Sequence, residues 1–377
     1  MDGKKKKIVM IGPVYPYKGG ISHYTGLLYK ELMEYYDVTL ISYKLQYPKF
    51  LFKKEQKDYE NDSLKIEEAQ YLINTANPFN WIKAAMNINK IEADMVIIQW
   101  WHPYFAPCYW TMCKVLRKTK ILFICHNVFP HEHFPMDRFL TKRTLVNGDC
   151  FIVHSTKDEE DLRLIHTSPV YIKTVLPTFN FFKKGVMTVE EAREKLNLMK
   201  EEKVLLFFGF VREYKGLKYL LRALPATREQ LPNMKLLVVG DFGGDKEVYI
   251  ELIKELEIDS SVRIFDGYIP DHEVGIYFSA CDLVVLPYES ATQSGIVPIA
   301  YDFEKPVVVT DVGGLPDVVE DGKTGYVVKA EEPGAIAEAV CNYFEDNKKE
   351  KMIENIRAEA WKYSWERMRE NVDSFLD

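Results

Sequence analysis

Short apolar segments alternate with amphipathic helical stretches along the chain, and this alternation limits its possible folds more than any other feature. Runs of four to six apolar residues without intervening polar ones are typical of strands buried on both faces of a parallel sheet. The helical stretches between them, such as 21–35 and 217–228, complete βαβ units. The predicted strands are Ile8–Gly12, Val38–Tyr43, Met95–Gln99, Ile121–Cys125, Phe151–His154, Val204–Gly209, Leu236–Gly240, Val262–Phe265, Leu283–Pro287 and Val307–Thr310.

These segments form two series, one in each half of the 377 residues. The pattern is interrupted at 176–180, so we expect one Rossmann-like domain over 1–178 and a second over 179–361. A final helix at about 362–377 is expected to cross back to the first domain. The predicted fold class is α/β, with two doubly wound parallel sheets facing an interdomain cleft. Open parallel sheets bind ligands beyond the carboxyl ends of their strands, so chemistry is expected in the loops after the strands.

Composition excludes several classes of protein. Hydrophobic residues make up 47% and charged residues 28%, which argues against disorder. No apolar run approaches the roughly 18 residues of a membrane-spanning helix, and the apolar segment after Lys7 is too short for a signal peptide. Six cysteines without a CxxC pair indicate free thiols in a reducing cytoplasm, with no disulfide framework. Neither half carries a GxGxxG dinucleotide motif, which disfavours an NAD-dependent oxidoreductase, and no nucleic-acid-binding motif is present.

The net charge of −7 conceals an asymmetry between the halves. Residues 1–178 contain 24 Lys and Arg against 19 Asp and Glu (+5), and residues 179–377 contain the other 25 against 37 (−12). A basic first half suits an acidic or membrane-surface partner. Candidates for phospholipid contact are Lys4, Lys5, Lys6, Lys7, Lys49, Lys53, Lys54 and Lys57. The alternative is that these lysines are ordinary solvated charges.

Two loops in the first half are candidates for chemistry. Gly19 and Gly20 precede a predicted helix, where paired glycines allow close backbone approach and free N–H groups favour an anion. The alternative is a plain glycine turn. His126 directly follows a strand and is suited to hydrogen-bond a hydroxyl or share a proton, or else to be a satisfied core histidine. His131 and His133 follow it, but the segment contains Pro130 and lacks the spacing of a helical zinc site, so no metal is expected.

Two loops in the second half carry polar groups of the kind that bind a sugar and a phosphate. Arg212 and Lys215 lie between a strand and a helix, where two cations suit a diphosphate. The loop 288–296 offers hydroxyls, an amide and a carboxylate before another helix, including Thr292 and Ser294. Solvated charge in the first loop and an ordinary N-cap in the second are the alternatives.

Several stretches resemble the retaining glycosyltransferases of the GT4 family (glycosyltransferase group 1), which have the GT-B fold. They include GPVYPYKGGISHYT (12–25), HNVFPHE (126–132), FGFVREYKGLKYLLRALP (207–224), VRIFDGYIPDHEVGIYFSACDLVVLPYE (262–289) and SGIVPIAYDFEKPVVVTDVGGLPDVVEDGKTGYVV (294–328). The resemblance spans nearly the whole chain and is weakest at 45–89. It implies that His126, Arg212 and Lys215 are catalytic. The implied donor-binding residues are Gly19, Gly20, Tyr268, Ile269, Glu289, Thr292, Gln293, Ser294, Gly295 and Ile296.

One departure from the family concerns the two glutamates that usually lie eight positions apart. Glu289 is present, but Val297 stands eight positions later, and the usual position of the second glutamate falls at or near Ile299. The TQSG sequence of 292–295 resembles one branch of the family. This departure leaves the ribose and sugar contacts open, and with them the roles of Glu289 and Gln293.

The resemblance implies transfer of a sugar, with retention, from a nucleotide-diphosphate sugar to a saccharide or lipid-linked acceptor in polysaccharide or glycolipid synthesis. No metal or other cofactor is expected, and no nucleic acid partner. The expected location is cytoplasmic, with peripheral contact at the inner face of a membrane. Two alternatives remain: a non-catalytic subunit that binds nucleotide sugars, and a GT-B epimerase acting on a nucleotide sugar.

Overall fold

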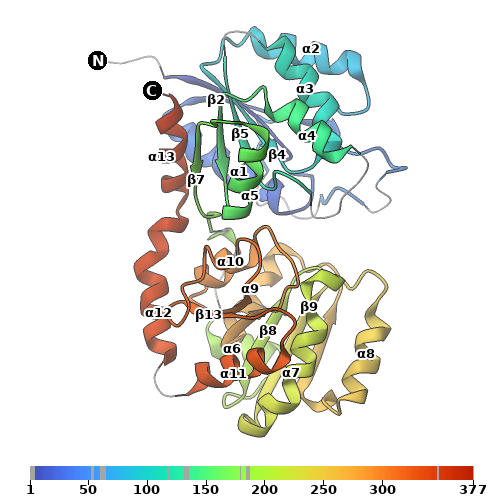
Figure 1. The fold of residues 1–377 in the computed structure, drawn as a ribbon, viewed down its shortest axis with the longest axis vertical. Helices are drawn as coiled ribbons and strands as arrows, with labels where there is room; N and C mark the ends of the chain where they lie inside the picture. The colour runs from blue at the N-terminus through green and yellow to red at the C-terminus, as the bar shows by residue number, and fades with distance from the viewer. Residues whose placement is uncertain are drawn as a thin grey trace. The chain divides into compact units, whose positions relative to one another are not determined.

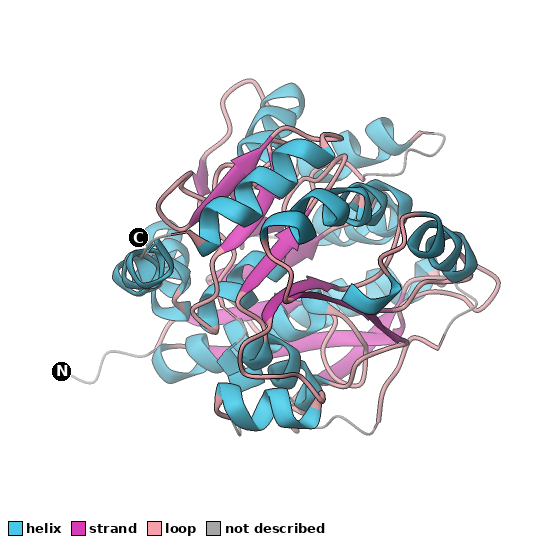
Figure 2. Ribbon diagram, turned by 90° about the horizontal axis from the view of Figure 1, so that it is seen from below, coloured by secondary structure: helices cyan, strands magenta, loops and turns pink. Residues whose placement is uncertain are grey.

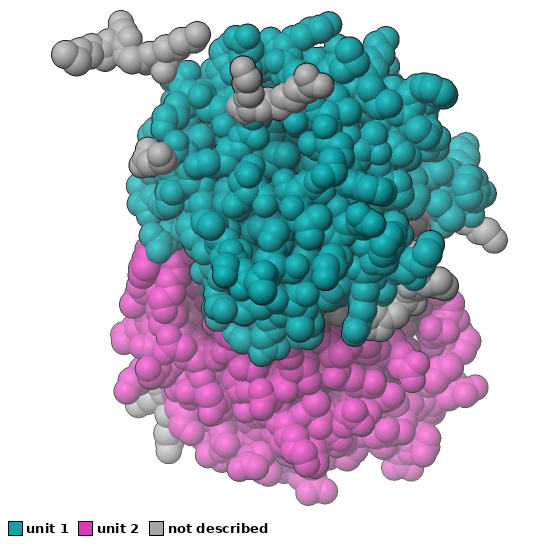
Figure 3. Space-filling view, turned by 45° about the horizontal axis from the view of Figure 1, so that its top comes forward, with its two compact units in different colours: residues 1–175, 364–377 teal, residues 176–363 magenta. Residues whose placement is uncertain are grey.

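The chain divides into two compact units in the computed structural model. The first comprises Met1–Val175 and Ser364–Asp377, and the second comprises Leu176–Tyr363 (Figure 3). The structure describes residues 5–51, 55–59, 65–116, 119–130, 136–178, 180–183, 187–345 and 348–376. The sequence predicts a domain boundary between 178 and 179, and the observed division lies between Val175 and Leu176.

The first unit is built on a seven-stranded parallel sheet with the order β3-β2-β1-β4-β5-β6-β7. Helices flank the strands (Figures 1 and 2). Its elements are β1 (Lys7–Ile11), α1 (Gly20–Tyr35), β2 (Asp37–Leu45), β3 (Gln70–Asn74), α2 (Pro78–Asn89), β4 (Met95–Trp100), α3 (Ala106–Val115), β5 (Lys120–Cys125), α4 (Asp137–Leu145), β6 (Cys150–Val153), α5 (Thr156–Ile165), β7 (Tyr171–Lys173) and α13 (Trp365–Leu376).

The second unit is built on a six-stranded parallel sheet with the order β10-β9-β8-β11-β12-β13. Its elements are α6 (Val189–Lys195), β8 (Lys203–Phe208), α7 (Leu217–Gln230), β9 (Met234–Gly240), α8 (Lys246–Glu255), β10 (Val262–Asp266), α9 (Asp271–Ala280), β11 (Leu283–Leu286), α10 (Ile296–Asp302), β12 (Val307–Thr310), β13 (Gly325–Val328), α11 (Pro333–Phe344) and α12 (Lys348–Glu359). The predicted pair of doubly wound parallel sheets is confirmed.

All ten predicted strands occur, within two residues at each end, and three further strands were not predicted. These are β3, β7 and β13, and each lies at an edge of its sheet. Every residue of the central strands β4 and β6 is buried, whereas β7 has none buried. An edge strand is covered less completely, so its sequence lacks the continuous apolar run that marks a central strand.

The last helix, α13, packs against α1 within the first unit. The Tyr24 ring lies edge to face against the Trp365 ring, with 5.1 Å between centroids, and its hydroxyl lies 3.4 Å from Sδ of Met368. Arg369 pairs with Glu31 at 3.4 Å. The end of the chain is therefore part of the first unit's hydrophobic and ionic packing.

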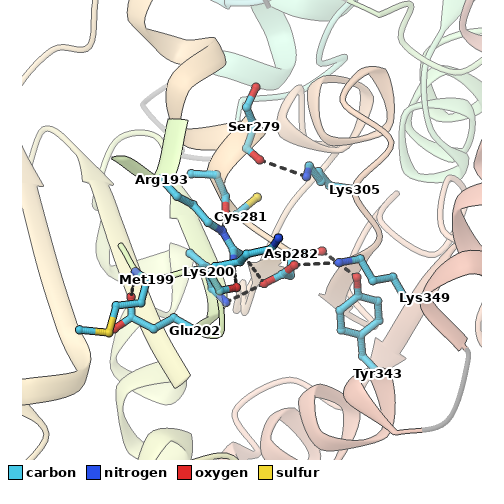
Figure 4. Close-up of polar contacts among 12 residues, drawn as sticks. Arg193, Met199, Lys200, Glu202, Ser279, Cys281, Asp282, Lys305, Tyr343 and Lys349 are labelled. Atoms are coloured by element: carbon cyan, nitrogen blue, oxygen red, sulfur yellow. Dashed lines mark hydrogen bonds and ion pairs between the residues drawn. The ribbon is translucent and has the colours of Figure 1, made fainter. Parts of the chain in front are cut away.

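Asp282 lies at the edge of the second sheet where the strands begin, and it contacts several neighbouring elements there (Figure 4). Its Oδ2 accepts from Arg193 Nη2 at 2.7 Å and from the Val204 N–H at 2.9 Å, and its Oδ1 pairs with Lys349 Nζ at 2.9 Å. The Tyr343 hydroxyl donates to the Asp282 carbonyl oxygen at 2.8 Å. The carboxylate thus joins α6, β8 and α12, and the backbone carbonyl of the same residue joins α11.

Candidate active site

The order of the second sheet places the candidate residues at its topological switch point. From β8 the chain proceeds to β9 and β10 on one side, and from β11 to β12 and β13 on the other. β8 and β11 are paired neighbours, so the loops that follow them lie side by side beyond the carboxyl ends of the strands. This end of the sheet is the position at which open parallel sheets bind ligands. Arg212 and Lys215 follow β8, and the loop 287–295 follows β11.

Arg212 extends from the β8 loop toward the loop after β9. Its Nη1 donates to the carbonyl oxygen of Val211 at 2.9 Å, and its guanidinium carbon lies 5.5 Å from the centre of the Phe210 ring. A Cβ on Gly243 would lie 2.7 Å from Nη1, and Gly243 has a φ of 66°. A glycine here therefore leaves room for the guanidinium.

Lys215 turns toward the other side of the switch point. It ends a 3-10 turn, Glu213–Lys215, and its Nζ lies 5.2 Å from the centre of the Tyr288 ring after β11. Gly216 follows with a φ of 64°, and a Cβ there would lie 1.9 Å from the carbonyl oxygen of Pro287. Glycine is required for this close approach of α7 to the end of β11.

Neither cation of this pair contacts a carboxylate among the residues that the structure describes. Glu213, beside them in sequence, lies 3.7 Å from Lys218 instead. Arg212 and Lys215 are both only partly buried. These two cations lie at the start of a helix and have no acidic partner in the described part of the chain, although their half of the chain has a charge of −12. This arrangement favours an anionic ligand.

The loop after β11 holds its polar groups in defined places. Glu289 pairs with Lys218 of α7 at 2.8 Å, and its N–H donates to the Tyr214 carbonyl oxygen at 2.7 Å. The Ser294 hydroxyl lies 3.4 Å from the Tyr288 hydroxyl and accepts from the Ile296 N–H at 3.3 Å. Thr292 is buried, and its carbonyl oxygen accepts from the Gly314 N–H at 2.9 Å. The loop is thus tied to α7 and to the loop after β12.

The other predicted donor-binding residues of this unit lie around the same edge. Gly295 is the N-cap of the short helix α10, which begins at Ile296, and Gln293 precedes it. A Cβ on Gly209 would lie 3.3 Å from Lys215 Nζ and 3.9 Å from Cδ1 of Ile296, so α10 begins close to the lysine. Tyr268 and Ile269 follow β10, two strands from β8, and Tyr268 is exposed.

In the first unit, Gly19 and Gly20 lie at the corresponding position after β1. Gly19 has a φ of 107° and is the N-cap of α1, which begins at Gly20. A Cβ at either position would have no neighbour within 4 Å, so both glycines face open space among the described residues. The geometry is compatible with the predicted backbone approach to a ligand.

His126 lies in a buried polar group at the ends of β4, β5 and β6. Its Nε2 is 2.7 Å from Oε1 of Gln99, and its ring lies edge to face against Tyr24, 4.7 Å between centroids. Burial, and secondarily the neighbouring His154, holds the pKa of His126 well below its usual value. The imidazole is therefore neutral at neutral pH. This environment favours hydrogen bonding over proton transfer, and the contact with Gln99 also fits the alternative of a satisfied core histidine.

Several predicted features fall outside the described residues or outside these sites. His131, His133, Lys4, Lys53 and Lys54 lie outside the described residues. Among those described, no three His, Cys, Asp or Glu side chains are grouped as metal ligands. No helix in the described ranges has the length and hydropathy of a membrane-spanning segment.

Four residues with a clear place in these sites were not predicted from the sequence. Tyr288 faces Lys215, Lys218 holds Glu289, and Gln99 and Tyr24 contact His126. Gln99 carries a signal that could have been used, because it is the one polar residue in the otherwise apolar strand MVIIQW. The others depend on which loops and helices meet in three dimensions.

Comparison with known families gives a match within the second unit. Residues 188–359 match the family described as Glycosyl transferases group 1. The matched segment lies within the second unit and covers less than half of the chain. The matched segment contains Arg212, Lys215 and the whole loop after β11.

The chain is also similar to named glycosyltransferases over part of its length. The D-inositol 3-phosphate glycosyltransferases of Corynebacterium diphtheriae and Corynebacterium urealyticum are 29% and 31% identical over 63% and 62% of the chain. The matches span only 58% and 57% of those proteins.

Two solved structures share the fold over 98% of the chain: a sucrose-phosphate synthase from Thermosynechococcus elongatus (TM-score 0.73, 19% identity, 98% of its chain) and HepE from Anabaena in complex with UDP (0.74, 17%, 99%). At these identities the likeness shows the fold alone, which is the GT-B fold of two Rossmann-like domains.

Proposed function

We propose that the protein is a retaining glycosyltransferase that moves a sugar from a nucleotide-diphosphate sugar to a hydroxyl of a saccharide or lipid-linked acceptor. The observation that carries the proposal is the Arg212 and Lys215 pair at the switch point of the second sheet, without a carboxylate partner in the described residues. UDP is the first nucleotide to test, because the related HepE was solved with UDP and with UDP-glucose.

The proposed reaction places the two cations on the leaving group. The bond between the sugar C1 and the β-phosphate oxygen breaks, and its electron pair remains on the diphosphate. The acceptor hydroxyl oxygen bonds to C1 on the same face, and its proton passes to the leaving phosphate oxygen. Arg212 and Lys215 stabilise the charge that develops on the diphosphate, which is typically the largest electrostatic contribution in such a step.

The remaining predicted residues would orient the donor. Neutral His126 would hydrogen-bond a hydroxyl of the transferred sugar, and Gly19 and Gly20 would allow the backbone to approach the reaction centre. In the loop after β11, Ser294, Gly295 and Ile296 would direct backbone N–H groups at the donor. Glu289, Thr292 and Gln293 supply further polar groups, and Tyr268 and Ile269 would border the base. The reaction needs no metal or other cofactor in this proposal.

We extend the proposal to a lipid-linked acceptor because the first half of the chain has a charge of +5. The proposed enzyme would then act in the cytoplasm, at the inner face of a membrane. Polysaccharide or glycolipid synthesis would be its setting. The loss of the second family glutamate, at or near Ile299, favours one alternative: a non-catalytic subunit that binds nucleotide sugars.

The test measures products from a panel of nucleotide sugars, with and without saccharide acceptors. Release of nucleoside diphosphate together with a glycoside of the donor's anomeric configuration supports the proposal. A free nucleotide without any glycoside, accompanied by an epimerised sugar, would indicate an epimerase. Binding without release of nucleotide would indicate the non-catalytic subunit.

A further inference from the structure

Helix α2 presents apolar side chains on its solvent side. Phe79, Ile82 and Met86 follow one another at i, i+3 and i+7, and Phe79 is 85% and Met86 55% exposed. The opposite side of the same helix packs on the sheet through Ala84 and Ile88. A surface helix normally turns polar residues to solvent, so an apolar stripe on its outer side points to a further partner.

The apolar surface continues over the neighbouring helices. α3 packs between α2 and α4 (Figure 1). Beside and on α4, Met136, Phe139 and Val146 are all exposed, Met136 by 67%. The Arg143 guanidinium lies 5.3 Å from the centre of the Phe139 ring and 5.7 Å from that of Trp110 on α3, which links the two helices at the surface.

The charge of these helices is almost entirely positive. α2, α3 and α4 together carry five cations: Lys83, Lys114, Arg138, Lys142 and Arg143. Their single acid, Asp137, is buried, and its carboxylate accepts from the Arg138 N–H at 2.5 Å. The next helix in the chain, α5, has the opposite character, with four acids against two cations.

We propose that α2, α3 and α4 form a docking face for an anionic membrane surface, with Phe79, Ile82, Met86 and Phe139 entering the interface and the cations contacting lipid phosphates. Helices that lie in the interfacial plane combine these two kinds of residue. Long Lys and Arg side chains place their charge among headgroups while their stems cover apolar surface. The inference rests on the proposed function, because it names the surface that brings the first unit to a lipid-linked acceptor.

Charge decides between a membrane and a second copy of the chain. Two copies meeting through this face would bring ten cations against two buried acids. Like charges across an interface are unfavourable. An anionic bilayer complements the same charges, and its acyl region accepts the apolar stripe without requiring a matching shape.

The test is flotation of the full chain with vesicles of phosphatidylcholine alone or mixed with phosphatidylglycerol. One variant replaces the stripe (Phe79→Ser, Ile82→Ser and Met86→Ser), and a second replaces two cations (Lys142→Gln and Arg143→Gln). Leu164→Ser on α5 is the matched control, because Leu164 is 70% exposed on the acidic helix. All replaced side chains are exposed, so unchanged melting temperatures are expected and are checked.

Salt-sensitive binding to the mixed vesicles is expected for the wild type and for Leu164→Ser, and each docking-face variant is expected to lose at least tenfold in partition coefficient. Unchanged binding of both docking-face variants would overturn the inference. So would loss of binding only when Lys49 and Lys57 are replaced, or a change of oligomeric state in the stripe variant. Donor turnover is measured separately in vesicle-free buffer, so failure of the proposed enzyme and failure of the docking face are distinguished.

Discussion

The two edges of the second sheet use cations in opposite ways. Where the strands begin, Arg193 and Lys349 are both paired with the Asp282 carboxylate (Figure 4). Where the strands end, Arg212 and Lys215 lie on aromatic rings and contact no carboxylate among the described residues. A cation's partners, more than its charge, therefore distinguish a structural role from a ligand-binding one.

Removing the shared carboxylate should have the largest effect on stability. Asp282→Ala leaves Arg193 buried without a counter-charge and also removes the acceptor of the Val204 N–H. Loss of one partner of a buried ion pair costs about 3–5 kcal/mol. Calorimetry should show a lower melting temperature. A melting temperature equal to that of the wild type would contradict the structural role of the Asp282 carboxylate.

At the opposite edge, Lys215→Ala should remove activity without affecting stability. The lysine has no carboxylate partner in the described residues, so the free energy of unfolding should change by less than about 0.5 kcal/mol. Turnover of the nucleotide sugar should fall by about 10²–10³-fold, as for the loss of one group that stabilises developing negative charge. Full turnover in this variant would contradict its assignment to the diphosphate.

Acid should remove the stability that the Asp282 carboxylate contributes at the edge where the strands begin. Burial alone would raise the pKa of Asp282, but Lys349, the Val204 N–H and Arg193 together hold it below its usual value. The folded protein therefore binds this proton less readily than the unfolded chain does. The stability contributed by the carboxylate is complete above the unfolded pKa of about 3.9 and is lost as the pH falls through the lower folded pKa. Acid unfolding of Asp282→Asn should lack this contribution; identical acid profiles would refute it.

The Lys218 and Glu289 pair should show the smallest effect. Both side chains are partly exposed, so solvent screens their attraction and the coupling should be about 0.5–1 kcal/mol. A double-mutant cycle with Lys218→Met and Glu289→Gln measures it directly. A coupling of several kcal/mol would mean that this pair has a structural role like that of the ion pairs of Asp282, and it would contradict the contrast between the two edges.

The sequence predicted the central strands and the loops of the site because both depend on local patterns. The runs from Val204 and Leu283 are apolar because both faces of these strands are covered, and Arg212 and Lys215 are recognisable by their place after a strand. The edge strand β7 escaped prediction, since its three residues are not buried.

Contacts between distant segments could not be predicted at all. Nothing local to Tyr288 or Lys218 indicates that one faces Lys215 and the other holds Glu289, because the order of the strands brings these segments together. His126 shows the same limit. Its position after a strand was visible in the sequence, whereas its burial beside Gln99, Tyr24 and His154, which keeps it neutral, depends on the packing of α1 against the sheet.

The central claim, that the cations at the switch point bind a diphosphate, is tested most directly by isothermal titration with UDP, GDP and ADP. The tightest ligand is then titrated into Arg212→Ala, Lys215→Ala and Lys349→Ala, the last of which removes the same charge from the opposite edge. We expect a roughly 10–100-fold weaker Kd for each of the first two variants and an almost unchanged Kd for Lys349→Ala. Equal affinity in all three variants, or an equal loss in all three, would contradict the binding of a diphosphate by Arg212 and Lys215.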